Sequence, residues 1–97
     1  IPTGILGIST PTVFVSSFPN PFNQEVTFRY NLEETTQFRL DIYDLSGRFI
    51  ATVVRGNYNA GMHTATWNSS SYSSGTYIAK AYNGEAVVQT LKVNKIN

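Results

Sequence analysis

Apolar and polar residues alternate along most of this chain. Residues 24–32 read QEVTFRYNL, so every second side chain from Val26 to Leu32 is apolar or aromatic. Phe38, Leu40 and Ile42 repeat the alternation a few positions later. Because consecutive side chains of a β-strand point to opposite faces, a strand with this pattern buries one face and exposes the other. No part of the sequence shows the period of an amphipathic helix, and the pattern therefore predicts an all-β protein.

Turn-forming residues divide the chain into short segments at intervals of roughly ten residues, which is typical of β-sandwiches. The expected strands are 12–16, 24–32, a third that contains Phe38 to Ile42, 48–54, 62–67, 76–82 and 85–93. Asp44-Leu45-Ser46-Gly47 predicts a hairpin in which Gly47 adopts a positive φ angle. Asn83-Gly84 predicts a second hairpin, with both residues at the central positions of a type I′ turn. The polar run 56–61 is expected to cross from one sheet to the other.

A chain of 97 residues has room for one domain, and this length is sufficient for a modest core without metals or disulfides. Seven strands, with a crossover between the fourth and fifth, indicate two antiparallel sheets packed face to face in an immunoglobulin-like sandwich. Residues 1–11 contain glycine, proline and small polar residues without periodicity, so we expect a linker from an upstream domain. The folded domain is predicted to occupy residues 12–97.

The composition narrows the possible partners. The opening Ile1-Pro2-Thr3-Gly4 lacks the charged start of a signal peptide, and no apolar run reaches the roughly 18 residues needed to span a bilayer. We therefore expect a module of a larger protein.

The net charge is +1, charged residues make up 13% of the chain, and Lys and Arg do not cluster. This argues against a nucleic-acid partner, because phosphate binding requires several clustered cations. Cysteine is absent, which excludes disulfides, thiol catalysis and thiolate metal sites.

Candidate catalytic groups are few. His63 is the only histidine, and no carboxylate neighbours it in sequence to support general-base or metal chemistry. On the expected strand 62–67 it alternates with Met62, so we expect its ring to face solvent or a sheet edge. None of the six acidic residues belongs to a calcium-loop pattern. Asp44 is expected to accept a hydrogen bond from a backbone N–H two residues on, within its own turn. We therefore predict no catalytic residue, no metal site, no cofactor and no enzyme activity.

The aromatic residues raise the alternative of a sugar-binding surface. Trp67 ends a strand, and Tyr77 begins another just after Gly75, where β-sandwiches place a ring that packs inward with its hydroxyl bound to the backbone. Both are therefore expected in the core. Tyr58, Tyr72 and Tyr82 are better candidates for exposure, although they lie in different segments.

Five sequence blocks occur in an order that resembles a known family. They are Phe18 to Asn23 (FPNPFN), Ile42 to Arg48 (IYDLSGR), Gly61 to Trp67, Ser74 to Tyr77 (SGTY) and Lys92-Val93. In this order they are similar to the type A C-terminal sorting domain of the type IX secretion system, and the resemblance covers the chain from Phe18 to its C-terminus. Members of that family are small immunoglobulin-like sandwiches at the end of large secreted enzymes and adhesins of Bacteroidetes-like bacteria.

The resemblance implies recognition and not catalysis. It implies that an outer-membrane translocon recognises the domain after periplasmic entry, that a sorting protease removes it, and that the cargo is secreted or delivered to the cell surface. The positions that match the family motif are Pro19, Asn20, Pro21, Asp44, Gly47, Arg48, Gly75, Tyr77 and Lys92. The expected partners are thus the translocon, the sorting protease and an upstream cargo domain of the same parent chain, with no nucleic acid and no membrane insertion.

A non-catalytic sorting domain is therefore the predicted function. A structural spacer and a carbohydrate-binding module of a secreted enzyme remain as alternatives, because a sandwich fold alone does not define a function. If the terminal strand, residues 85–93, lies at a sheet edge, it offers backbone donors and acceptors with which a receptor could pair by strand addition.

Overall fold

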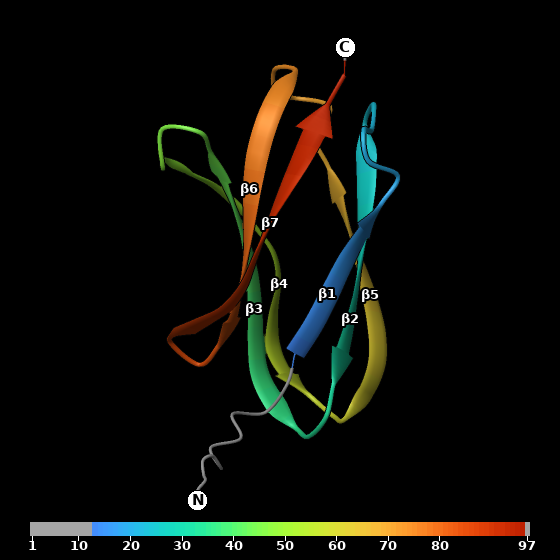
Figure 1. Ribbon diagram of the computed structural model, residues 1–97, viewed down its shortest axis with the longest axis vertical. Helices are drawn as coiled ribbons and strands as arrows, with labels where there is room; N and C mark the ends of the chain where they lie inside the picture. The colour runs from blue at the N-terminus through green and yellow to red at the C-terminus, as the bar shows by residue number, and fades with distance from the viewer. Residues whose placement is uncertain (1–12, 97) are drawn as a thin grey trace, which may run out of the picture.

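Two antiparallel β-sheets pack face to face in this chain, as the computed structural model in Figure 1 shows. The structure describes residues 13–96, so the predicted linker 1–11 lies outside the described residues. The strands are β1 (Val13–Phe18), β2 (Glu25–Leu32), β3 (Thr36–Asp44), β4 (Phe49–Tyr58), β5 (Gly61–Asn68), β6 (Gly75–Asn83) and β7 (Ala86–Lys95). One sheet has the order β1-β2-β5 and the other the order β4-β3-β6-β7. The predicted all-β sandwich of seven strands is confirmed.

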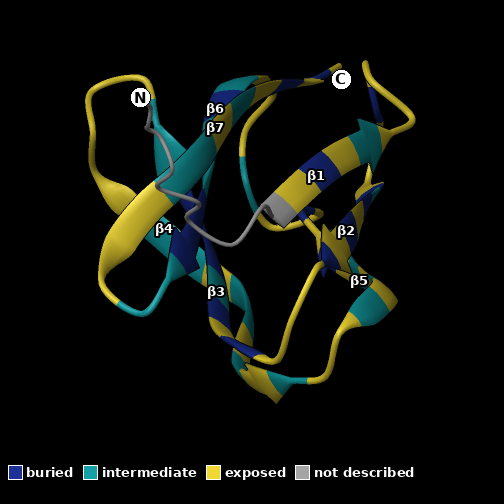
Figure 2. Cartoon of the chain, turned by 60° about the horizontal axis from the view of Figure 1, so that its bottom comes forward, coloured by how far each residue is buried: buried dark blue, intermediate teal, exposed yellow. Residues whose placement is uncertain are grey.

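The core lies between the sheets and includes the alternating residues that the sequence pattern identified. Every second residue of β2 from Val26 to Leu32 is buried, and so are Phe38, Leu40 and Ile42 of β3. Tyr30 stacks on Phe38 of the other sheet, with ring centroids 4.3 Å apart. Each buried side chain of this size stabilises the fold by about 1.5–3 kcal/mol relative to exposure. Figure 2 shows the alternation as bands of buried and exposed residues along β1 and β2.

The fourth strand is longer than predicted, so the crossover from one sheet to the other, which is confirmed, is shorter than the expected range 56–61. β4 continues to Tyr58, so only Asn59 and Ala60 connect it to β5. Gly56 and Asn57 are poor strand formers, but β4 is an edge strand that pairs with β3 alone, and edge positions tolerate such residues. The remaining strand bounds differ from the expected ones by one or two residues. Within the described residues no helix is long and apolar enough to cross a membrane.

The hairpin predicted at Asn83-Gly84 forms, but its central residues lie one position further on. Asn83 pairs with Ala86, which leaves Gly84 and Glu85 as the two loop residues. Gly84 has a φ angle of 63°, and its N–H donates to the carbonyl of Gln37 at 2.8 Å. This contact with β3 fixes the turn at Gly84, so the assignment of Asn83 to a central position is wrong.

The faces predicted for Met62 and His63 are reversed. Met62 is 58% exposed, whereas His63 pairs in register with Tyr30, whose ring is buried. Directly opposed residues of an antiparallel pair share a face, so His63 points inward with Tyr30. Its ring lies between Tyr30 and Tyr58, with centroids 5.3 Å and 5.4 Å away, and a ring nitrogen is 2.8 Å from the carbonyl of Asn59. His63 is therefore a half-buried packing residue of β5.

The hairpin between β3 and β4 requires a positive φ angle at Gly47, as predicted. The observed φ is 89°, and the Gly47 N–H donates to the carbonyl of Asp44 at 3.0 Å. A Cβ atom at this position would meet nothing within 4 Å, so a larger residue is disfavoured by its backbone conformation and not by a clash.

The change Gly47→Val is expected to lower the free energy of unfolding by about 1–3 kcal/mol, because a β-branched residue is strained at this φ. For a domain of this size, 1 kcal/mol corresponds to a fall in melting temperature of roughly 4–8 °C. Thermal unfolding followed by circular dichroism measures the change. Gly47→Asn is the matched control, because Asn tolerates positive φ, and it should lose less stability. An unchanged melting temperature for Gly47→Val would contradict the strain.

Candidate recognition site at the C-terminal end of the sandwich

The positions that match the family motif lie at one end of the sandwich. β1, β3, β5 and β7 end there, and β2, β4 and β6 begin there (Figure 1). We call this the C-terminal end, because β7 finishes there. The β1–β2 loop supplies Pro19, Asn20 and Pro21, the β3–β4 hairpin supplies Asp44, Gly47 and Arg48, β6 supplies Gly75 and Tyr77, and β7 supplies Lys92. The fold thus brings together positions from four separate segments of the sequence.

The Asn20 side chain binds the backbone of the last strand. Its Nδ2 donates to the carbonyl of Lys92 at 3.2 Å, and its Oδ1 accepts from the N–H of Asn94 at 2.9 Å. Pro19 and Pro21, on either side of it, both follow cis peptide bonds. The amide of Asn20 therefore satisfies one acceptor and one donor on the outer edge of β7, the edge that faces away from β6.

Phe22 continues this contact with its own backbone. Its N–H donates to the carbonyl of Asn94 at 2.9 Å, and its carbonyl accepts from the N–H of Ile96 at 2.8 Å. The two bonds form a short parallel bridge between Phe22 and Lys95. The outer edge of β7 is therefore already paired near its end.

A second side-chain amide, that of Gln89, makes a contact in the opposite direction, from β7 to the backbone of β1. Gln89 of β7 accepts from the N–H of Val15 through Oε1 and donates to the carbonyl of Val15 through Nε2, both at 2.8 Å. The Gln89 side chain thus satisfies both backbone groups of Val15 on β1, an edge strand of the other sheet, which removes a template for unwanted strand pairing. We call this contact the β1–β7 seam, formed by Val15, Asn20 and Phe22 on one side and by Gln89, Lys92, Asn94 and Ile96 on the other.

Aromatic rings fill the core beneath the C-terminal end. Trp67 is buried and packs against Phe22, Tyr72 and Tyr77, with ring centroids 6.1, 5.6 and 5.4 Å away. The Tyr77 hydroxyl donates to the carbonyl of Ser73. The predictions that Trp67 and Tyr77 are core residues, and that the Tyr77 hydroxyl binds the backbone, are confirmed. Burial raises the pKa of Tyr77, and the nearby charge of Asp44 adds to that effect.

The tyrosines considered for a sugar-binding surface do not form one. Tyr82 is buried, with its hydroxyl 3.0 Å from that of Tyr43 and its ring beneath the Arg39 guanidinium. The prediction that Tyr82 is exposed is therefore wrong, because Arg39 covers its ring. Tyr58 and Tyr72 are half-buried, each with its ring against an inward-facing ring, Tyr30 or Trp67.

Asp44 organises the tip of the β3–β4 hairpin. Its Oδ1 accepts from the N–H of Ser46 at 3.0 Å, from the Ser46 hydroxyl at 2.7 Å and from the N–H of Arg48 at 2.9 Å. The Arg48 Nε lies 3.2 Å from Oδ2. The predicted bond to the backbone N–H two residues on is confirmed. Asp44 and Gly47 shape the turn, Arg48 closes it with a side chain that is 78% exposed, and the apolar Leu45 and Phe49 project at the same tip.

The hydrogen bonds to Asp44, above all the one from the Ser46 hydroxyl, lower the pKa of its carboxyl to about 2. The pKa in an unfolded chain is about 3.9. Because the folded value is the lower one, the carboxylate stabilises the hairpin above about pH 4, and this contribution is lost as the pH falls toward 2. A carboxyl-carbon NMR titration should therefore give a midpoint near 2 for Asp44, and Ser46→Ala should raise it. A midpoint near 3.9 in the unaltered chain would contradict the bonding scheme.

Within residues 13–96, the C-terminal end exposes side chains that a binding partner could contact. No group of three His, Cys, Asp or Glu side chains in that range is placed to hold a metal ion. At the C-terminal end the carboxylate of Asp44 is engaged by its own turn, and the Tyr77 hydroxyl by the backbone. Exposed groups at this end include the cationic Arg48 and the apolar Leu45 and Phe49, beside the polar Ser46 and Asn94 and the acidic Glu25.

Comparison with known families identifies the family of the chain. A family model described as the secretion system C-terminal sorting domain matches residues 16–95. The chain belongs to this sorting-domain family. The match runs from within β1 to the last residue of β7, so it includes the second half of β1, all of the other strands and five of the seven residues of the β1–β7 seam. A search of curated proteins found no match.

The resemblance inferred from the five sequence blocks is thus confirmed. As a member of this family, the sorting domain is a C-terminal sorting signal for type IX secretion. It is a cargo-linked tail that interacts with the type IX secretion machinery, and it marks a secreted or cell-surface protein. The family is non-catalytic in general.

Proposed function

We propose that the C-terminal end of the sandwich is the surface that an outer-membrane translocon recognises after the cargo has entered the periplasm. A sorting protease then removes the domain from its cargo, and residues 1–11 are the linker between the two. The observation that supports this most strongly is the gathering of all the family-motif positions around the end of β7. Those positions come from distant segments, yet each shapes the end or is exposed on it.

Two groups of residues have different roles in this proposal. Asn20, Asp44, Gly47 and Tyr77 hold the loops and β7 in place through the bonds described above. Arg48 and Lys92, which are both exposed, contact the translocon directly together with the apolar hairpin tip. Pro19, Pro21 and Gly75 set the course of the backbone at the loop and at the start of β6. The domain has no catalytic role of its own, in keeping with a histidine that is packed between tyrosine rings.

The seam limits how a receptor can use β7. β7 is an edge strand of its sheet, but the outer-edge groups of Lys92, Asn94 and Ile96 are bound to Asn20 and Phe22. Strand addition at residues 92–96 would require release of the β1–β2 loop. We therefore propose that the translocon binds the assembled end, with the seam closed, through outward side chains.

The change Asn20→Ala tests the role of the closed seam. Loss of a net hydrogen bond of about 1 kcal/mol should speed amide hydrogen exchange at Asn94 by roughly five- to tenfold. Asn20→Asp is the matched control, because it keeps the oxygen that accepts from Asn94, and it should protect that amide better. If the closed seam is recognised, a reporter fused to the Asn20→Ala domain should be delivered less efficiently in a type IX-competent host. Faster exchange together with improved delivery would contradict the proposal and favour strand addition.

A further inference from the structure

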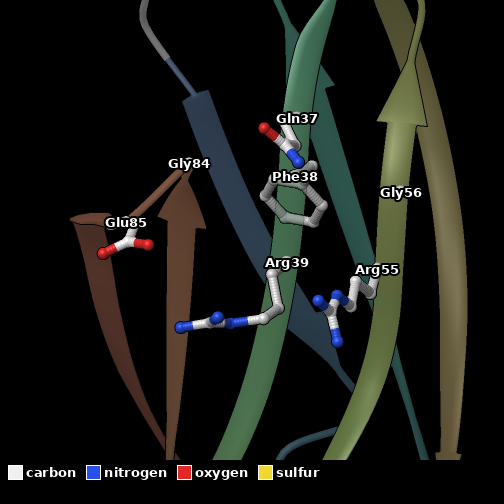
Figure 3. A pocket seen from close by; sticks show the side chains of 7 residues that line it. All are labelled: Gln37, Phe38, Arg39, Arg55, Gly56, Gly84 and Glu85. Carbon is white, nitrogen blue, oxygen red and sulfur yellow. The ribbon is translucent and has the colours of Figure 1, made fainter.

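The opposite end of the sandwich holds a cavity that the sorting role does not use. It has a volume of about 190 Å³, and Gln37, Arg39, Arg55 and Glu85 line it. These residues come from the start of β3, from β4 and from the β6–β7 turn. Figure 3 shows Arg39 between Arg55 on the β4 side and Glu85 on the side of the turn. We propose that this cavity binds a single carboxylate group, of the kind presented by an aspartate or glutamate side chain of a polypeptide.

The positions of Arg39 and Arg55 are unfavourable for the stability of the sheet. Arg39 and Arg55 are directly opposite each other in the β3–β4 register. Like charges at such positions are unfavourable, because the side chains share one face at short range. Within residues 13–96 Arg55 makes no hydrogen bond, ion pair or ring contact, and it is exposed. Arg55 therefore adds repulsion to the sheet without a compensating contact, and an anion between the two guanidinium groups would supply that contact.

Arg39 is held in position for such a ligand. Its guanidinium lies 4.0 Å above the Tyr82 ring, and its Nε is 3.0 Å from Oδ2 of Asp41. Asp41 is itself buried and accepts from the Thr52 hydroxyl at 2.8 Å. Stacking and pairing leave the Arg39 terminal nitrogens free to donate, and a planar guanidinium presents them in the geometry that a carboxylate accepts.

The charge balance of the cavity selects a monoanion. Asp41 offsets Arg39, and Glu85 places a second negative charge at the rim, so Arg55 is the positive charge left without an ion pair. Glu85 repels a sulfate or phosphate dianion about twice as strongly as it repels a singly charged carboxylate at the same distance. A carboxylate can bind the two arginines, and the Gln37 amide can donate to it. β1 also begins at this end of the sandwich, so an upstream domain of the same polypeptide is a candidate source of the carboxylate (Figure 1).

Side-chain NMR of the 97-residue chain tests the proposal, with glutamate blocked at both backbone ends as the probe and blocked glutamine as its neutral match. Blocked glutamate should shift the Nε–Hε signals of Arg39 and Arg55 in a saturable way, and blocked glutamine should not. Arg55→Gln should weaken binding at least about tenfold, which equals about 1.4 kcal/mol. Arg29→Gln is the matched control, since Arg29 is an exposed arginine on β2, in the other sheet, and affinity should stay within about twofold.

Two further binding measurements determine the chemical class of the ligand. Sodium sulfate at equal ionic strength should bind more weakly than blocked glutamate, and Glu85→Gln should strengthen sulfate binding. Tighter binding of sulfate or of glucuronate would overturn the assignment to a polypeptide carboxylate. Shifts that do not saturate, or equal affinity in Arg55→Gln, would overturn the site itself. None of these outcomes bears on sorting, because the cavity and the proposed recognition surface around Asp44, Arg48 and the end of β7 lie at opposite ends of the sandwich.

Discussion

Replacement of Phe22 by alanine is expected to lower the free energy of unfolding by about 3–5 kcal/mol. The Phe22 ring is 1% exposed and packs against Trp67, so its removal leaves a cavity beneath the C-terminal end. The same residue binds β7 through its backbone N–H and carbonyl, and the buried ring is what anchors that loop. Because whole domains are stable by only about 5–15 kcal/mol, the variant should be close to the limit of folding.

Urea unfolding followed by circular dichroism measures this change. The midpoint should fall while the dependence on urea concentration stays the same, as for a two-state domain with an unchanged core area. Phe14→Ala is the matched control, because Phe14 is 66% exposed on β1, and its loss should change stability by less than about 0.5 kcal/mol. Equal effects of the two changes would show that the Phe22 ring does not anchor the loop to β7.

The parts of the fold that were predictable from sequence are those that depend on neighbouring residues. Period-two alternation gave the strands, because the residues that alternate are the ones that face the core. Asp44 and Gly47 were predictable because a turn is built from consecutive residues, and the bonds of Asp44 to Ser46 and Arg48 are local. The inward packing of Tyr77 was predictable from its place just after Gly75.

The contacts that were not predictable join residues far apart in sequence. Asn20 binds Lys92 and Asn94 across 72 and 74 positions, and Gln89 binds Val15 across 74. Asparagine and glutamine are common surface residues, and nothing local marks these two as partners of a strand edge. The resemblance to the sorting-domain family pointed to Asn20, but Gln89 had no such indication.

The reversed assignment of His63 has a similar origin. Met62 and Trp67 are five positions apart, so in a regular strand they cannot both face the core. The larger Trp67 is buried and Met62 is exposed, and His63 then takes the inward side with Trp67. The size of the Trp67 side chain determines which face of β5 is buried, and the alternation of residues alone does not predict this.

Loss of the last residues is expected to abolish delivery of a fused cargo. Residues 91–97 contain three of the seven seam residues, Lys92 among them, and the end of β7, and Val93 is fully buried. A reporter fused to the full 97 residues should reach the surface or the medium in a type IX-competent host, while one that ends at Thr90 should remain in the periplasm. Because this truncation also destabilises the core, a second variant must separate the two effects.

Leu40→Ala provides that separation. Leu40 is fully buried in β3, so the change should cost about 2–5 kcal/mol, but it leaves the motif residues and the C-terminal end in sequence. A fusion with Leu40→Ala should be delivered far better than the truncated one, because instability alone does not remove the recognised surface.

The most direct measurement of the central claim is therefore the fraction of reporter outside the cell for the full, truncated and Leu40→Ala fusions in the same host. The account predicts high delivery for the full fusion, substantial delivery for Leu40→Ala and retention in the periplasm for the fusion that ends at Thr90. Delivery of the truncated fusion at the level of the full one would contradict it.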